Sequence, residues 1–250
     1  MRIKYLFLLC FALPAIWRQG ISAQEYKVFS ISSERLEVTK SLDDVSDSDA
    51  FRIVEPYKKS VDSVMAPVLG QSMVAMDVKR PESLLSNWAA DVMVEASTAT
   101  GLPKADMGLI NMGGLRSNMP KGIVRRGDII QISPFENKVC VLEMKGSDVE
   151  ELMRNIAAVH GEGVSAEVRL VISSDGQLKS ATINGQPIDH NRTYRVATLD
   201  YLAEGNDKMY ALKKHSKKYD MGIMVREAMM ESIIKNRNIN SRIEGRIIVE

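Results

Sequence analysis

The sequence predicts an α+β fold, in which helices pack on a mixed β-sheet within a single domain. Segments with helical periodicity alternate along the chain with short strand-like runs, as in a sheet covered by helices. Two expected hairpins place neighbouring strands antiparallel, so the sheet is not purely parallel. A chain of 250 residues is long enough to bury a sizeable core. No internal repeat, low-complexity tract or long linker divides it.

The first 23 residues are typical of an export signal. Arg2 and Lys4 precede an apolar run at residues 5–13, and Ala23 is a small residue suited to a cleavage site. The run is too short to span a bilayer comfortably, and no later segment reaches the necessary length. We therefore expect a mature domain at residues 24–250 that works outside the cytoplasm, in the periplasm of a bacterium.

The first part of this domain is expected to hold a hairpin and two helices. Residues 26–31 alternate as a strand does, and residues 35–39 form the expected hairpin partner. Apolar residues then recur at helical spacing over residues 50–67, where an internal proline would delay or kink the helix. A stronger helical signal begins after Ser83 and stops at the Gly-Leu-Pro sequence of residues 101–103.

Most of the expected strands lie in the second half of the chain. They occupy residues 107–111, 138–144, 168–173, 178–183, 194–199 and 246–249. Helices are expected at residues 148–159 and 222–235, with a short turn or helix at residues 127–130. Asp175-Gly176 predicts a hairpin between the two strands that flank it, because this dipeptide favours a tight β-turn.

The charge of the chain argues against a nucleic acid or an anionic membrane as its partner. The whole sequence carries a formal net charge of +1, and the predicted mature domain carries −2. Such partners require a strong basic excess. Of two cysteines, Cys140 alone remains after the signal, so no internal disulfide is expected. Its apolar neighbours predict a buried, unreactive side chain.

The chain lacks the sequence features of a self-contained hydrolase. Its three histidines, His160, His190 and His215, are dispersed, and no two lie at the spacing of metal ligands. A site for two metal ions needs several His and Asp side chains together. There is also no P-loop, Gly-x-Ser-x-Gly elbow or dinucleotide-binding motif. We therefore expect no catalytic residue, cofactor or metal ion in this chain, and a solvated loop at the lysine-rich residues 213–218.

The most informative motif is the turn that follows the strand ending at residue 111. Its key residues are Asn111, Gly113, Gly114 and Arg116, which place an amide, bare backbone N–H groups and a guanidinium around one small space. Glycine permits a close approach that a side chain would block. The arginine offers a planar set of donors to carboxylate, phosphate or ribose oxygens. On spacing alone, a strand-ending turn with a surface arginine explains these residues equally well.

Aromatic and polar residues stand at other turns and loops of the chain. Phe135 and Tyr201 both lie in loops beside predicted strands, where two rings could clamp a flat ring between their faces. Arg80, Asn137 and Asp207, with the arginine of the glycine turn, could satisfy hydroxyls or phosphates around that ring. A nucleoside has this combination of groups. The alternative is that the two aromatic rings only fill the core.

Together, these motifs resemble the C-terminal, substrate-binding domain of the 5′-nucleotidase family. The resemblance rests on five ordered blocks, at residues 80–91, 111–116, 134–137, 194–207 and 243–247. Their order and separation are more specific than any block alone. Residues 80–250 are therefore the best-supported part of the predicted domain.

The resemblance implies a role for each candidate residue. Phe135 and Tyr201 would stack on the two faces of the base, and Asn137 would contact its edge. Asp207 would bind the ribose hydroxyls. The residues implied to hold ribose or phosphate oxygens are Arg80, Asn111 and Arg116.

Two positions depart from the family pattern. The family's Gly-Gly-Asp-Gly turn reads Gly205-Asn206-Asp207-Lys208 in this chain, which changes the backbone around the aspartate. Tyr201 stands where the family usually has phenylalanine, so the ring can still stack but carries an added hydroxyl.

The family's N-terminal domain, which carries two metal ions and cleaves the phosphate ester, has no expected counterpart in this sequence. Three interpretations are open. The chain could complete a 5′-nucleotidase with a separate exported metallophosphatase, which would bind the divalent metal ions. It could instead be an exported nucleoside-binding module without a catalytic partner. The third interpretation is a hydrolase with an unrecognised site.

Overall fold

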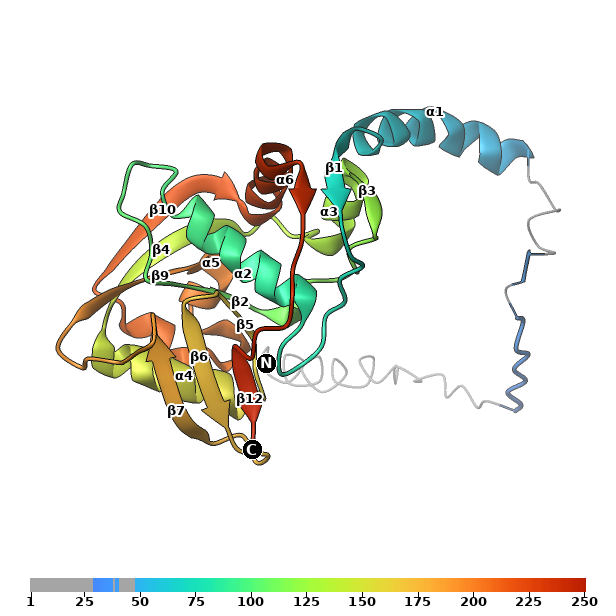
Figure 1. Ribbon diagram of the computed structural model, residues 1–250. Helices are drawn as coiled ribbons and strands as arrows, with labels where there is room; N and C mark the ends of the chain where they lie inside the picture. The colour runs from blue at the N-terminus through green and yellow to red at the C-terminus, as the bar shows by residue number, and fades with distance from the viewer. Residues whose placement is uncertain (1–28, 38, 41–47) are drawn as a thin grey trace, which may run out of the picture. The chain divides into compact units, whose positions relative to one another are not determined.

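Helices and strands alternate along the chain, as the sequence pattern predicts (Figure 1). The computed structural model describes residues 29–37, 39–40 and 48–250. The predicted export signal and the start of the mature domain at residue 24 lie outside the described residues and stay predictions. The chain divides into two units, residues 1–48 and 49–250. Apart from the first residue of α1, the helices and strands named below belong to the second unit.

The elements are named here in chain order by type. The α-helices are α1 (Ser48–Met65), α2 (Leu84–Ala96), α3 (Arg126–Ile132), α4 (Gly146–Ala158), α5 (Asp200–Ala203) and α6 (Val225–Asn236). Short 3-10 helices are η2 (Met112–Gly114), η3 (Asn206–Lys208) and η4 (Tyr210–Lys214). The strands are β1 (Val68–Ser72), β2 (Met107–Ile110), β3 (Gly122–Arg125), β4 (Lys138–Lys145), β5 (Gly163–Val164), β6 (Val168–Ile172), β7 (Leu178–Ile183), β8 (Gln186–Pro187), β9 (Thr193–Leu199), β10 (Lys217–Met224), β11 (Asn238–Ile239) and β12 (Ile247–Val249).

The predicted α+β class with mixed strand directions is confirmed, but the described strands form three sheets rather than one. The largest sheet has the order β10-β4-β9-β2-β5. In it β2 runs parallel to β9, with Met107 opposite Val196, whereas β4 is antiparallel to both of its neighbours. The smaller sheets have the orders β11-β1-β3 and β12-β6-β7-β8. The second of these contains the predicted hairpin, β6-β7.

Helix α2 packs directly on the five-stranded sheet. It begins as predicted, because the hydroxyl of its N-cap Ser83 accepts a hydrogen bond from the backbone N–H of Ser86. A Cβ at Gly108 of β2 would lie 2.3 Å from the carbonyl oxygen of Ala90, so only glycine allows this contact. The close packing fixes β2 just before the turn that carries Asn111.

Strand β4 lies inside the same sheet, between β10 and β9, and most of its residues are buried. Cys140 lies on it and is buried, as its apolar neighbours predict. Burial raises the pKa of the Cys140 thiol to about 12. The thiol therefore stays protonated near neutral pH and acts as a packing group rather than as a nucleophile.

Some predicted boundaries are wrong for local reasons. The described part of the expected N-terminal hairpin, residues 29–31 and 35–37, forms no strand. An isolated pair of strands is marginally stable without a further strand or an apolar surface. Helix α2 ends at Ala96, earlier than expected, and the hydroxyl of Ser97 donates to the carbonyl oxygen of Val94, 2.6 Å away.

The lysine-rich segment is exposed to solvent, as predicted, but it contains regular structure instead of forming a loop throughout. Lys217 and Lys218 belong to β10, which pairs antiparallel with β4 at the edge of the sheet. Lysines commonly mark edge strands, where they discourage pairing with another molecule. Because β10 extends to Met224, helix α6 begins at Val225 rather than at Gly222.

Helix α1 forms as predicted and contains Pro56. Its apolar side chains do not reach the core, since no residue of this helix is buried. Phe51 and Val61, for example, have 60% and 51% of their surface exposed. The core of the domain instead consists of side chains from the sheets and from helices α2, α4 and α6.

A buried arginine ties the C-terminal segment to α2. The two terminal nitrogens of Arg246 donate to both carboxylate oxygens of Asp91, at 2.7 and 2.8 Å. The guanidinium also donates to Glu244 and to the carbonyl oxygens of Asn87 and Val164. Only 4% of the Arg246 side chain is exposed, so these bonds replace nearly all of its hydration. This network joins segments far apart in sequence.

Replacing Arg246 with methionine should destabilise the domain strongly. The change removes the guanidinium that pairs with the Asp91 carboxylate and donates to two buried carbonyl oxygens, and such a loss typically costs about 3 kcal/mol or more. Urea unfolding should report this loss. The exposed Arg154, paired with Glu150 on the surface of α4, provides the control, and Arg154→Met should change stability by less than about 1 kcal/mol. Equal effects of the two substitutions would contradict the role given to Arg246.

Candidate functional site

The predicted site residues lie at one edge of the five-stranded sheet. Because β2 and β9 run parallel and β4 runs antiparallel to β9, the ends of the first two strands meet the start of the third. The pairing of Val139 with Leu199 brings the loop before β4 close to the start of α5. Three separate segments therefore deliver side chains to the same place.

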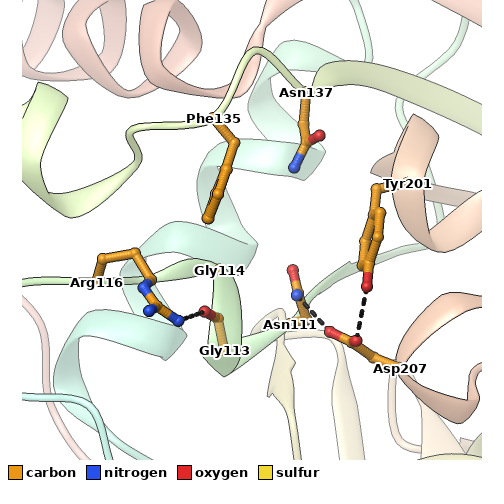
Figure 2. Close-up of a pocket in the computed structure, with 8 residues that line it drawn as sticks. All are labelled: Asn111, Gly113, Gly114, Arg116, Phe135, Asn137, Tyr201 and Asp207. Atoms are coloured by element: carbon orange, nitrogen blue, oxygen red, sulfur yellow. Dashed lines mark hydrogen bonds between the residues drawn. The ribbon is translucent and has the colours of Figure 1, made fainter. Parts of the chain in front are cut away.

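Eight of the nine predicted site residues line one cavity of about 390 Å³ (Figure 2). They are Asn111, Gly113, Gly114, Arg116, Phe135, Asn137, Tyr201 and Asp207. The volume is in the range of ordinary small-ligand sites. The structure thus brings together residues that are up to 96 positions apart in the chain.

The two aromatic rings stand on opposite sides of this cavity and turn their faces toward each other (Figure 2). Phe135 is 46% exposed and Tyr201 is 40% exposed, so the interpretation that they fill the core is wrong. Arg226 of α6 donates to the carbonyl oxygen of Pro134, 3.3 Å away, and contacts Glu136. This arginine, which the sequence analysis missed, holds the loop that carries the Phe135 ring.

Asp207 lies at the lower end of the space between the rings, as Figure 2 is drawn. The amide Nδ2 of Asn111 donates to Oδ2 of Asp207 at 2.6 Å, and the Tyr201 hydroxyl donates to Oδ1 at 3.0 Å. The hydrogen bond to Asp207 raises the pKa of the Tyr201 hydroxyl above its ordinary value. The hydroxyl therefore remains a donor at neutral pH. Oδ1 of Asn111 is buried without a hydrogen-bond partner.

The glycine turn also lines the cavity (Figure 2). Gly113 and Gly114 belong to η2, and a Cβ at Gly114 would lie 2.8 Å from Oδ1 of Asn111. Arg116 is exposed at the mouth of the cavity, and its Nη1 donates to the carbonyl oxygen of Gly113 at 3.2 Å. The backbone N–H of Arg116 donates to Ile132, which ties the turn to the end of α3.

Arg80 is the one predicted site residue that does not line the cavity. Its guanidinium pairs with Glu162 and donates to the carbonyl oxygen of Gly161, at 2.9 Å. Its predicted contact with a ligand oxygen stays a prediction. In the structure, Arg80 contacts Glu162, whose carboxylate accepts a hydrogen bond from the start of the glycine turn.

Glu162 is a supporting residue that the sequence analysis missed. Its carboxylate is 2% exposed and accepts a hydrogen bond from the backbone N–H of Met112, 2.5 Å away, at the start of η2. Burial raises the pKa of the Glu162 carboxyl, and the Met112 N–H and Arg80 oppose that rise. In the sequence, only the two glycines that flank Glu162 could have drawn attention to it. The structure shows why they are glycines, because a Cβ at Gly161 would lie 2.5 Å from Pro81 and one at Gly163 would lie 2.7 Å from Ile110.

The described residues offer no set of ligands for a metal ion. No group of three or more His, Cys, Asp or Glu side chains converges in that part of the chain. His190 contacts Glu150, and the ring of His215 bonds to the carbonyl oxygen of Leu212. Neither histidine lines the cavity. In the same described ranges, no helix combines the length and apolar character that a membrane span requires.

Comparison with known proteins finds similar chains among nucleotide phosphoesterases and 5′-nucleotidases. The chain is 26% identical over 220 residues to the trifunctional nucleotide phosphoesterase protein YfkN of Bacillus subtilis, covering 80% of this chain and 15% of that protein. It is 34% identical over 107 residues to the protein UshA of Yersinia enterocolitica, covering 41% and 19% respectively. The crystal structure of a 5′-nucleotidase precursor from Thermus thermophilus matches with a TM-score of 0.72 and 25% identity. That match covers 81% of this chain and 43% of the other.

The family model of the 5′-nucleotidase C-terminal domain matches residues 64–214. The chain therefore belongs to this family, and the predicted resemblance is confirmed. The chain spans less than half the length of the relatives it matches. The activities of those whole proteins accordingly belong to the proposals below.

Replacing Glu162 with alanine should lower the free energy of unfolding by about 1–3 kcal/mol, because the buried Met112 N–H loses its acceptor. Glu162→Gln should cost less, since the amide oxygen can still accept that hydrogen bond. Urea unfolding at neutral pH compares the variants. A larger loss of unfolding free energy in Glu162→Gln than in Glu162→Ala would contradict the role of Glu162 as a hydrogen-bond acceptor.

The same residue should contribute to the pH dependence of stability. A carboxyl whose pKa is higher in the folded than in the unfolded state binds more protons when folded. Its contribution to stability is therefore largest at low pH and declines as pH rises through the folded pKa. Glu162→Gln should remove this decline from the pH profile of the unfolding free energy. An unchanged slope between pH 4 and about pH 7 would show that Glu162 does not carry it.

Proposed function

We propose that this domain binds the nucleoside part of a nucleotide in the cavity between Phe135 and Tyr201. The observation that carries the proposal is the placement of two exposed aromatic rings face to face across a cavity that also contains a carboxylate and a guanidinium. Membership in the 5′-nucleotidase C-terminal domain family supports it. The domain then serves as the substrate-binding half of a 5′-nucleotidase-type phosphohydrolase in nucleotide breakdown.

The cavity has a complementary group for each part of a nucleotide. A base can stack between the two rings, and Asn137 stands between them to contact its edge (Figure 2). Asp207 can accept hydrogen bonds from ribose hydroxyls. Arg116, at the open side of the cavity, offers charge-assisted donors to a phosphate. A bound nucleotide would then direct its phosphate out of the domain.

We further propose that a separate chain with a metallophosphatase domain supplies the chemistry of phosphate cleavage. The described residues do not fit a pair of metal ions, because their histidines and carboxylates do not converge. No step through a metal ion is therefore assigned to this chain. Its own residues bind the nucleoside, exclude water from the base and orient the phosphate toward the partner. Export to the periplasm, proposed from the first 23 residues, would place both chains in one compartment.

Phe135→Ala should weaken nucleoside binding by roughly ten- to a hundredfold. Stacking of one base on an aromatic side chain typically contributes about 1–3 kcal/mol. Calorimetric titration of the full chain with a panel of nucleosides and nucleoside monophosphates measures the change. Phe51→Ala is the matched control, since Phe51 is also an exposed phenylalanine but lies on α1, outside the cavity. Unaltered affinity in the Phe135 variant would exclude stacking in this cavity.

Mixing with the exported metallophosphatase of the same organism should give a 5′-nucleotidase that this chain alone does not provide. Arg116→Ala should lower the kcat/KM of the mixture by roughly ten- to a hundredfold, the effect of losing a hydrogen bond between charged groups. The metal content should stay the same. Arg154→Ala serves as the control, because Arg154 is an exposed arginine outside the cavity.

Two outcomes would change this proposal. Chelator-sensitive hydrolysis of nucleotides by the purified chain alone would show that it contains its own metal site. Tight nucleoside binding without any gain of activity on mixing would favour the alternative of an exported nucleoside-binding module. In that case the cavity keeps its proposed ligand but loses its proposed partner.

A further inference from the structure

We propose that the hydroxyl of Tyr201 is a positioning group that aims the Asp207 carboxylate at a pair of adjacent hydroxyls on the ligand. The site would then select ribonucleosides over deoxyribonucleosides. This inference rests on the proposed nucleoside binding and adds the sugar to it. It assigns Tyr201 two tasks, because the ring forms one face of the clamp while the hydroxyl holds the group that binds the sugar.

The argument begins with the two tethers on Asp207. Each of its carboxylate oxygens accepts one hydrogen bond from the protein, Oδ2 from Asn111 at 2.6 Å and Oδ1 from the Tyr201 hydroxyl at 3.0 Å. A carboxylate has about four acceptor positions, two on each oxygen. One position therefore remains open on each oxygen. Two neighbouring oxygens, each with one open position, match two hydroxyls on adjacent carbon atoms.

Asp207 is not flanked by glycines, as the aspartate of the family's Gly-Gly-Asp-Gly turn is, so the backbone here differs from that turn. Asp207 and Lys208 both have left-handed backbone angles, with φ values of 51° and 66°. Residues other than glycine adopt this region less readily. The turn is held in place by side chains, since Nδ2 of Asn206 donates to the carbonyl oxygen of Tyr201 at 2.8 Å. The Tyr201 hydroxyl adds a second link between the same two segments.

The two links can be separated by substitution. Tyr201→Phe removes the hydroxyl that holds Asp207 but keeps the aromatic ring and the backbone carbonyl that Asn206 contacts. It therefore tests the aim of the carboxylate without removing the clamp. The other tether, from Asn111, remains but holds only one oxygen, so the carboxylate can rotate about that bond.

The side-chain amide of Asn111 donates its hydrogen bond to Asp207 in the same arrangement. Its two amide hydrogens are on the nitrogen that bonds to Asp207, and its oxygen is buried without a partner. Its residue surface is 5% exposed. Asn111 thus forms a fixed side of the Asp207 site, whereas the Tyr201 hydroxyl sits on an exposed ring at the opposite side. The aspartate is held between a buried donor and a donor on an exposed ring.

The test is calorimetric titration of the full chain with adenosine, uridine, and the 2′-deoxy and 3′-deoxy forms of each. In the wild type, the ribonucleoside should bind about tenfold or more tightly than either deoxy form, because each deoxy form loses one hydrogen bond to a carboxylate. In Tyr201→Phe, this ratio should fall at least about threefold. The ratio is the informative quantity, since a general loss of fold would weaken all ligands together.

Matched variants complete the design. Tyr210→Phe is the control, because Tyr210 is an exposed tyrosine outside the cavity, and its ratio should equal that of the wild type. Asp207→Asn should bring the ratio close to one, and it carries the test if Tyr201→Phe does not fold. A ratio that persists in Asp207→Asn would overturn the inference in that case.

The outcomes separate this inference from the proposed function. A wild type that prefers ribonucleosides, with the same preference in a folded Tyr201→Phe, would overturn the positioning role and leave nucleoside binding in place. Equal binding of ribonucleosides and deoxyribonucleosides by the wild type would overturn the selectivity. If the wild type binds none of these nucleosides, nucleoside binding itself fails and this inference fails with it.

Discussion

The register of three strands in the central sheet is the constraint on which the cavity depends. Because β2 and β9 are parallel and β4 is antiparallel to β9, residues at two strand ends and one strand start share an edge. A shift of one residue in any of these pairings would move the side chains to the other face. The close contact of α2 with Gly108 holds β2 against such a shift, since no other residue fits beneath the helix.

Residues behind the cavity keep its lining side chains in place. Glu162 holds the start of the glycine turn, Arg226 holds the Phe135 loop, and Asn206 ties η3 to α5. Each support is a hydrogen bond from or to the backbone, so it fixes a segment rather than a single side chain. The rings and charged groups of the lining stay exposed and remain available to a ligand; they belong to Arg116, Phe135, Tyr201 and Asp207. Rigid support with an exposed lining is the arrangement that reduces the entropy lost on binding.

The sequence predicted the lining of the site better than its supports. Tyr201 and Phe135 were recognisable through the ordered motif blocks that resemble a known family, whereas their chemistry alone left open the alternative that they fill the core. Glu162 was not, since a single acid between two glycines has no meaning until the fold places it under Met112. Strand β10 was not predicted, because its lysine-rich sequence does not indicate a strand and its pairing with β4 is visible only in the structure. The fold pairs Arg80 with Glu162, and its predicted contact with a ligand oxygen stays a prediction.

The separation between binding groups and cleavage chemistry also has a physical reason. Contacts to the nucleoside lie far from the bond that breaks, and they help catalysis only by positioning the phosphate against groups that act in the transition state. Such positioning requires a rigid cavity, which the central sheet and the supports behind the glycine turn provide. It does not require metal ligands in the same chain. On the proposed function, Arg116 links nucleoside binding to phosphate cleavage, because its backbone is fixed by the bond to Ile132 while its exposed guanidinium lines the cavity.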